Sequence, residues 1–331
     1  MKQKILLISS ANPYPIVTNG CARLVLDYQR TVFSGYDVHF VATAPETWEP
    51  LAWFHGQGEQ AQFSIERLLE LDFEFAFFVG FRYSDFSQQV TERMPSFCLT
   101  DTYPHGDLPE GIFRGILSHR AAFLRDDILL CSGSYDSEIF YKQRTGDDLV
   151  VSVGRIHPDK NQLELVSEYR ERIYNRYELP LYLIGGIDDL GYYRKVRLYI
   201  DQVSVRSTID DAHPHALDNW RSPLQIAALL NRARFFITGS SKESFGIALA
   251  EALACGTTCV LNGEFRGFDP ADLGPHVFGN ITEKRGSILD VLEKALATGA
   301  RLDGSEWVKK YSLVGAARRQ TEFIKTRLKE L

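Results

Sequence analysis

The sequence predicts an α/β fold made of two doubly wound domains. Short runs of β-branched and aromatic residues alternate with stretches rich in helix formers, a pattern typical of parallel sheets with helices between the strands. Gly20, Gly154 and Gly186 follow predicted strands, where glycine lets a ligand approach the backbone closely. The chain has 331 residues, 44% hydrophobic and 24% charged, which is enough for two such domains.

The first half of the chain predicts one domain, residues 1–146. We expect strands at 4–10, 37–43, 73–80, 96–100 and 128–131, a helix at 21–31, and a boundary in the polar stretch 142–148. This half holds 12 Lys+Arg and 18 Asp+Glu, which leaves 25 of each for the remainder and accounts for the net charge of −6. An acidic domain is a poor surface for nucleic acid or anionic lipid, so neither is expected as a partner.

The second half repeats the same alternation. Its predicted strands are residues 149–153, 181–184, 233–238 and 257–261. Its predicted helices run from the Lys160-Asn pair to about 177 and over 223–231, 245–255, 287–297 and 312–331. The stretch from 234 to 261 therefore reads as one complete strand–helix–strand unit.

Two carboxylates flank the predicted start of the helix in that unit. Glu243 and Glu251 are separated by seven residues, so they lie ~12 Å apart along the axis if most of the separation is helical. That length is comparable to a nucleotide diphosphate-sugar. Between them Ser244, Phe245 and Gly246 offer amide donors at a helix N-terminus, which favours phosphate. The alternative is an ordinary amphipathic helix with a capping acid and one exposed glutamate.

Two cations follow the first strand of the second half. Arg155 offers a planar fork for phosphate oxygens, and Lys160 offers a mobile point charge. The pairing suits a diphosphate leaving group, although two surface cations at a loop-to-helix junction would look the same. Gly154 and Gly186, each after a strand, leave room for such a ligand.

These motifs resemble those of the retaining GT-B glycosyltransferases of family 4. The string from Glu243 to Gly256 resembles the family's E-x7-E signature, and Gly154-Arg155 with Lys160 resembles its G-R-x-x-x-x-K. The resemblance covers most of residues 149–261 and only weakly the first domain. It implies two Rossmann-like domains that face a cleft, the second at 147–310, with the last helix, 311–331, packed back on the first domain.

The resemblance also implies the activity and the site. The expected enzyme is a retaining, metal-independent hexosyltransferase that uses a nucleotide diphosphate-sugar, with a UDP-sugar and UDP-glucose as the default. Its acceptor would be a saccharide or a lipid-linked molecule in polysaccharide or glycoconjugate synthesis. Glu243 would contact the sugar, Arg155 and Lys160 the diphosphate, and Glu251 the ribose. The backbone contacts to the donor would come from Gly20, Gly154, Gly186, Ser244, Phe245 and Gly246.

The first domain departs from the family pattern at two places. Asn19-Gly20 stands where the family has Gly-Gly, and Thr100-Asp101 stands where it often has His-Asp. Asp101 matches and Thr100 does not, while His105 lies near enough to substitute on the sugar or acceptor side. The alternatives are a sugar-nucleotide epimerase of the same architecture and a catalytically silent sugar-nucleotide-binding protein.

No cofactor or metal is expected, and the compartment is expected to be the cytoplasm. The chain has no D-x-D pair, and His213 and His215 have no third ligand nearby. The apolar run near the N-terminus is short and no signal cleavage site follows it, so neither secretion nor a membrane anchor is indicated. Free thiols are expected, because the five cysteines form no C-x-x-C pair: Cys21, Cys98, Cys131, Cys255 and Cys259.

Overall fold

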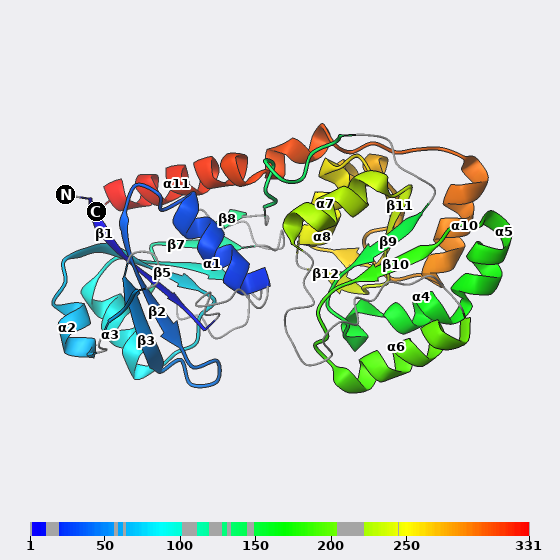
Figure 1. Cartoon of the computed structure of the whole chain (residues 1–331). Coiled ribbons are helices and arrows are strands. Elements are labelled where there is room, and N and C mark those ends of the chain that lie inside the picture. Colours follow the sequence, from blue (N-terminus) through cyan, green and yellow to red (C-terminus); the bar gives the residue numbers. More distant parts are fainter. Residues whose placement is uncertain are drawn as a thin grey trace. The chain divides into compact units, whose positions relative to one another are not determined.

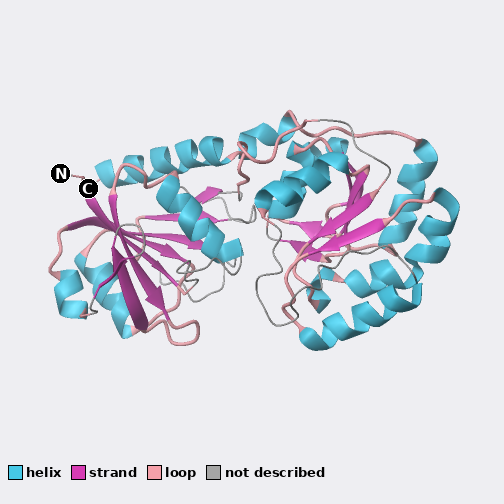
Figure 2. Cartoon of the chain, viewed as in Figure 1, coloured by secondary structure: helices cyan, strands magenta, loops and turns pink. Residues whose placement is uncertain are grey.

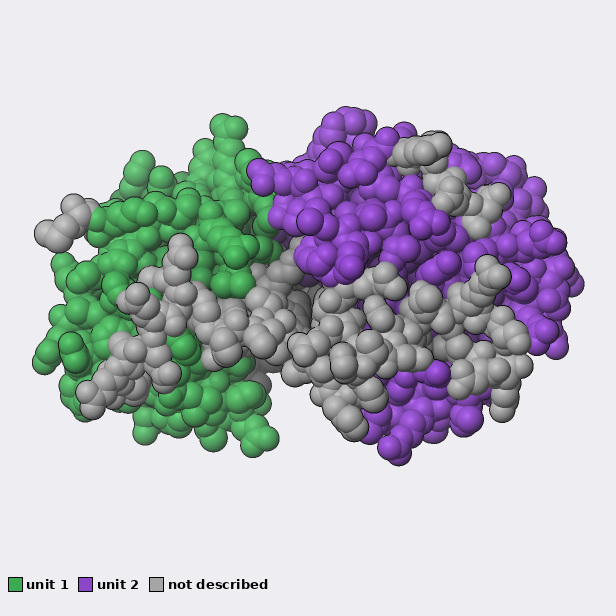
Figure 3. All heavy atoms as spheres, viewed as in Figure 1, with its two compact units in different colours: residues 1–132, 313–331 green, residues 133–312 purple. Residues whose placement is uncertain are grey.

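The chain folds into two α/β units (Figures 1 and 2). The computed structural model describes residues 2–10, 20–55, 59–61, 64–100, 111–118, 128–130, 134–143, 149–203, 222–243 and 245–330. The first unit comprises residues 1–132 and 313–331, and the second comprises residues 133–312 (Figure 3).

The first unit is built on an eight-stranded sheet of order β4-β3-β2-β1-β5-β6-β7-β8. Strands β2, β1, β5, β6, β7 and β8 are parallel, whereas β3 and β4 extend the sheet in antiparallel fashion beside β2. The strands are β1 (Lys4–Ser9), β2 (Asp37–Thr43), β3 (Pro50–His55), β4 (Glu59–Ala61), β5 (Phe73–Val79), β6 (Ser96–Thr100), β7 (Gly115–Ser118) and β8 (Ile128–Leu130).

Helices cover both faces of this sheet. One face packs on α1 (Gly20–Arg30) and α11 (Leu313–Lys329), through Val25, Tyr28 and Ile324. The other face packs on α2 (Ile65–Leu69) and α3 (Asp85–Arg93). Because neighbouring residues of a strand point to opposite faces, the fully buried run at 75–78 of β5 supplies both cores.

The second unit is built on a five-stranded, fully parallel sheet of order β10-β9-β11-β13-β15. Its strands are β9 (Val150–Val153), β10 (Leu181–Ile184), β11 (Phe235–Thr238), β13 (Thr258–Asn262) and β15 (Val277–Asn280). A separate pair, β12 (Lys242–Glu243) and β14 (Glu264–Phe265), joins the loops that follow β11 and β13.

Both faces of the second sheet are also covered. One face packs on α7 (Pro223–Arg232), α8 (Ile247–Ala254) and η4 (Trp307–Tyr311), and the other on α4 (Gln162–Tyr169), α6 (Leu190–Val203) and α10 (Ile288–Thr298). Shorter helical segments are η1 (Pro158–Lys160), η2 (Arg170–Tyr174), α5 (Asn175–Tyr177), α9 (Pro270–Leu273) and η3 (Gly274–His276).

The units divide at 132/133, earlier in the chain than the predicted 146/147. Tyr135 and Phe140 lie before the polar stretch but are buried in the core of the second unit, which explains the difference. The last helix belongs to the first unit, where Ile324 packs beneath the sheet. The antiparallel strands β3 and β4 were not predicted.

Cys98, Cys255 and Cys259 are free and buried, and burial raises the pKa of the Cys255 thiol to about 12, with a contribution from Glu251. Within the part of the chain that the structure describes, no helix is both long and apolar enough to cross a bilayer.

Candidate active site

The second sheet has a topological switch point between β9 and β11. From β9 the chain continues to β10 on one side of the sheet, and from β11 it continues to β13 and β15 on the other side. Helices therefore leave in opposite directions from the carboxyl ends of β9 and β11. The loops after these strands are the place where open parallel sheets bind ligands.

An ion pair joins those two loops. Lys160 ends η1, which follows β9, and Glu243 ends β12, which follows β11; the Lys160 ammonium donates to Oε1 of Glu243. Both side chains are about one-fifth exposed (20% and 19%). The structure thus brings together the two predicted residues that lie on either side of the switch point.

A second ion pair holds Arg155. The Arg155 guanidinium contacts the carboxylate of Asp188, in the loop after β10, and both side chains are exposed. Asp188 was not among the predicted site residues, because nothing in its sequence neighbourhood marks it as a partner of Arg155. Arg155 and Lys160 are therefore each paired with a carboxylate, and a diphosphate would have to compete with these carboxylates for both cations.

Glycines let these loops lie against each other. A Cβ on Gly185 would come 1.8 Å from the carbonyl oxygen of Gly154, and a Cβ on Gly239 would come 3.0 Å from that of Asn161. The backbone of Ile156 donates to the Gly186 carbonyl at 2.8 Å, which joins the loops after β9 and β10. Only glycine fits at position 185, so this contact fixes the loop that carries Arg155.

Gln162 supports the same loop from the start of α4. Its Nε2 donates to the Arg155 carbonyl at 2.7 Å, while its buried Oε1 has no hydrogen-bond partner. The hydroxyl of Ser240, after β11, is also fully buried and without a partner. Both unsatisfied polar atoms, one at the start of α4 and one in the loop after β11, are thus buried near the carboxyl edge of the sheet.

Helix α8 begins at Ile247, two residues later than the predicted start at Phe245. Gly246 precedes it in the left-handed conformation (φ 80°), and Glu243 lies outside the helix, in β12. The Phe245 side chain is buried against Phe268, with ring centroids 4.6 Å apart, so only its backbone remains for a ligand. The ~12 Å estimate for the distance between Glu243 and Glu251 assumed that most of the intervening residues are helical. Fewer of them are helical than that estimate assumed, because α8 begins only at Ile247.

Glu251 lies in the middle of α8 and is only 3% exposed. A glutamate is rarely buried to this degree in a helix whose other residues are apolar. The alternative of an amphipathic helix with one exposed glutamate therefore does not hold.

Of the residues predicted to contact the donor or acceptor in the first unit, the structure describes only some. Gly20 is the first residue of α1, and Thr100 is buried at the end of β6. Asn19, Asp101, His105 and, in the second unit, Ser244 lie outside the described residues, as do His213 and His215.

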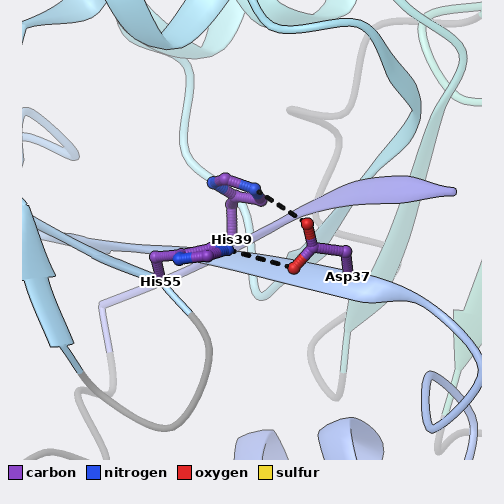
Figure 4. A group of neighbouring side chains, drawn as sticks. All are labelled: Asp37, His39 and His55. Atoms are coloured by element: carbon purple, nitrogen blue, oxygen red, sulfur yellow. Dashed lines mark hydrogen bonds and ion pairs between the residues drawn. The ribbon is translucent and has the colours of Figure 1, made fainter. Parts of the chain in front are cut away.

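One cluster of possible metal ligands was missed in the sequence. Asp37, His39 and His55 come together on β2 and β3 of the first unit (Figure 4). The D-x-H spacing of the first two is a weak signal by itself. The third joins them only through the antiparallel pairing of β2 with β3, which was not predicted.

Residues 137–269 match the family model for glycosyl transferases group 1. The matched segment lies within the second unit and covers less than half of the chain. The match includes Arg155, Lys160, Glu243 and Glu251, the residues that define the switch-point site. No curated protein matches the sequence at a significant level.

Solved structures agree on the fold over the whole chain. Sucrose-phosphate synthase from Thermosynechococcus elongatus has a TM-score of 0.71 at 13% identity and covers 100% of both chains. A glycosyltransferase from Rickettsia africae has a TM-score of 0.69 at 12% identity, again over 100% of both. Anabaena HepE in complex with UDP-glucose has a TM-score of 0.67 at 11% identity, over 98% of this chain and 99% of that one. The chain has the GT-B fold, with two Rossmann-like units.

Proposed function

We propose that this protein is a retaining glycosyltransferase that transfers a hexose from a UDP-sugar, with UDP-glucose as the first candidate, to a saccharide or lipid-linked acceptor. The observation that carries the proposal is the pairing of Lys160 with Glu243 across the switch point of the second sheet. It places a cation and a carboxylate on the two loops where this type of sheet binds a nucleotide.

The choice of donor rests on the chemistry of the site. Arg155 and Lys160 supply two positive charges on loops joined by glycine contacts, and the α8 N-terminus adds backbone amides after Gly246. These groups suit a diphosphate better than a single carboxylate or a neutral sugar. Anabaena HepE was solved with UDP-glucose, which makes uridine the base to test first.

The residues have distinct roles in the proposed reaction. Cleavage of the anomeric bond leaves negative charge on the departing diphosphate, and Arg155 and Lys160 would stabilise that charge as it develops. Glu243 would hold the sugar through its hydroxyls and, through its contact with Lys160, keep the ammonium beside the leaving group. Glu251 would bind the ribose. The acceptor would attack from the face of the departing phosphate, whose oxygen takes the proton, so that the anomeric configuration is retained without a metal ion.

The test is the release of nucleotide from a panel of sugar donors. UDP-glucose, UDP-galactose, UDP-N-acetylglucosamine, GDP-mannose and ADP-glucose are incubated with the wild-type protein, with and without simple saccharide acceptors. We expect one UDP-sugar to be hydrolysed slowly and to be used faster when an acceptor is present. The anomeric configuration of the product, read by proton NMR, tests retention.

Glu243→Gln is the matched variant, and Glu306→Gln, at an exposed turn residue before η4, is its control. Turnover should fall by about 10²-fold in the first and stay unchanged in the second. An interconverted sugar nucleotide without free UDP would indicate an epimerase. Tight binding of a donor that no acceptor ever consumes would indicate a silent binding protein.

A further inference from the structure

A cluster of three metal-binding side chains lies on one face of the first sheet. Asp37 and His39 are two residues apart on β2, and His55 is directly opposite His39 on β3. Because side chains alternate along a strand, all three project from the same face. Their ligand atoms lie within 4.8 Å of one another.

The two imidazoles point to the Asp37 carboxylate, one towards each oxygen (Figure 4). Nε2 of His55 is 3.1 Å from Oδ1, and Nε2 of His39 is 3.7 Å from Oδ2. An ion bound tetrahedrally at 2.0–2.1 Å holds its ligand atoms about 3.3 Å apart. The two separations from Asp37 are close to that value, and the exposed His55 can adjust its rotamer.

The Nε2 atom of His39, which faces the Asp37 carboxylate, has no hydrogen-bond partner. The ring of His39 is buried against Trp53 and Phe73, and the 3.7 Å from its Nε2 to Asp37 is too long for a hydrogen bond. Buried polar atoms are nearly always satisfied. Asp37 and His55 are 33% and 48% exposed, so an ion from solvent has access to the cluster.

We propose that Asp37, His39 and His55 bind one divalent ion of the zinc class, which joins strands β2 and β3. Two imidazoles and one carboxylate form a ligand set that zinc uses at open sites.

The indole N–H of Trp53 opposes metal binding at Nε2 of His39. Its indole N–H donates to Nδ1 of His39 at 3.2 Å, which places the proton of the neutral ring on Nε2. A metal at Nε2 displaces that proton to Nδ1, and the Trp53 N–H then loses its acceptor. Removal of this N–H should therefore strengthen metal binding, which distinguishes a specific site from chance adsorption to a histidine pair.

The experiment measures Zn²⁺ binding to tag-free full-length protein after chelator treatment, by competition with a chromogenic zinc indicator. The wild type should bind one Zn²⁺, and His55→Gln and Asp37→Asn should each bind it at least about tenfold more weakly. His276→Gln, which alters a histidine packed against Trp307 in the second unit, is the matched control and should bind as the wild type does. His55 is half-exposed, so its substitution leaves folding intact.

The affinity of Trp53→Phe for Zn²⁺ tests ligation by His39 directly. It keeps an aromatic ring in the core but removes the N–H donor, so the affinity for Zn²⁺ should rise by about threefold or more. Unchanged binding in His55→Gln and Asp37→Asn would overturn the site. An unchanged or weaker affinity in Trp53→Phe would contradict ligation through Nε2 of His39.

Discussion

Two groups of charged residues in the second unit differ in how their cations are paired. At the switch point, Arg155 and Lys160 each contact one carboxylate, Asp188 and Glu243. On η2, Arg172 contacts three carboxylates, Glu168 at 3.1 Å, Asp290 at 2.6 Å and Glu293 at 2.7 Å. A cation with one carboxylate partner keeps hydrogen-bond donors for a ligand, whereas the donors of Arg172 are already engaged. The two groups therefore differ in a way that favours ligand binding at the switch point and a structural role for Arg172.

We expect the largest loss of turnover from a substitution of Lys160 at the switch point. Lys160→Gln should reduce turnover of the UDP-sugar by about 10²- to 10³-fold, because the charge that stabilises the leaving diphosphate is lost. The free energy of unfolding should change by about 1 kcal/mol at most, since the ion pair is partly solvated. Turnover is measured by UDP release, and unfolding by urea titration.

Lys142→Ala is the control for that variant. Lys142 also contacts a single carboxylate, Asp303 at 2.6 Å, but it packs on Gly256 at the far end of α8. Its substitution should leave turnover unchanged. An equal loss in both variants would mean that any paired lysine of this unit affects turnover, and the comparison would fail.

Gly185→Ala tests whether loop contact positions Arg155. The added methyl would overlap the Gly154 carbonyl, so the variant should lose about 2 to 3 kcal/mol of unfolding free energy and bind donor more weakly. Gly274→Ala has no atom within 4 Å of the new Cβ and should be nearly neutral. Equal stability of the two variants, by thermal unfolding, would show that the loop after β10 relaxes freely.

Glu251→Gln separates binding from chemistry. Loss of a charged hydrogen bond to the ribose should weaken donor binding by about tenfold, while turnover at saturating donor changes little. The steady-state measurement is KM against kcat. A fall in kcat with unchanged KM would move Glu251 from the ribose to the reacting end of the donor.

Arg172→Gln tests whether the Arg172 cluster has only a structural role. We expect it to cause the smallest change of the variants, a modest loss of stability. Hydrogen bonds from Arg172 hold the pKa values of Asp290 and Glu293 below their ordinary values. Their contribution is therefore present above about pH 4.5 and is lost as the pH falls through the folded-state pKa values. The variant should lose about 1 kcal/mol of unfolding free energy at pH 7 and less at pH 3.

Turnover of Arg172→Gln should equal that of the wild type. A variant with normal stability and poor turnover would assign Arg172 to the site. Urea titrations at the two pH values and UDP release at pH 7 decide between these outcomes.

The contact between Lys160 and Glu243 could be predicted, because each residue follows a recognisable strand. Apolar runs ending in glycine located β9 and β11, and the carboxyl ends of adjacent parallel strands meet at one edge, which brings Lys160 to Glu243. The partner of Arg155 could not be predicted, because Asp188 reaches it through loop packing around Gly185. The start of α8 was placed too early, because Phe245 is an acceptable helix residue that tertiary packing directs against Phe268 instead.

The cluster in the first unit depends on antiparallel strand pairing, which the sequence pattern did not reveal. Strand β3 opens with Pro50 and buries only Trp53 and Phe54, so it lacks the nearly continuous buried run of central strands such as β1 and β5. Without its register against β2, His55 has no reason to lie opposite His39.

The most direct test of the central claim is calorimetric titration of UDP into the wild type, Arg155→Gln/Lys160→Gln and Arg172→Gln. We expect one UDP bound per chain, at least about tenfold weaker binding in the double variant, and unchanged binding in Arg172→Gln. Equal affinity in the double variant, or weaker binding only in Arg172→Gln, would contradict a diphosphate site at the switch point of the second sheet.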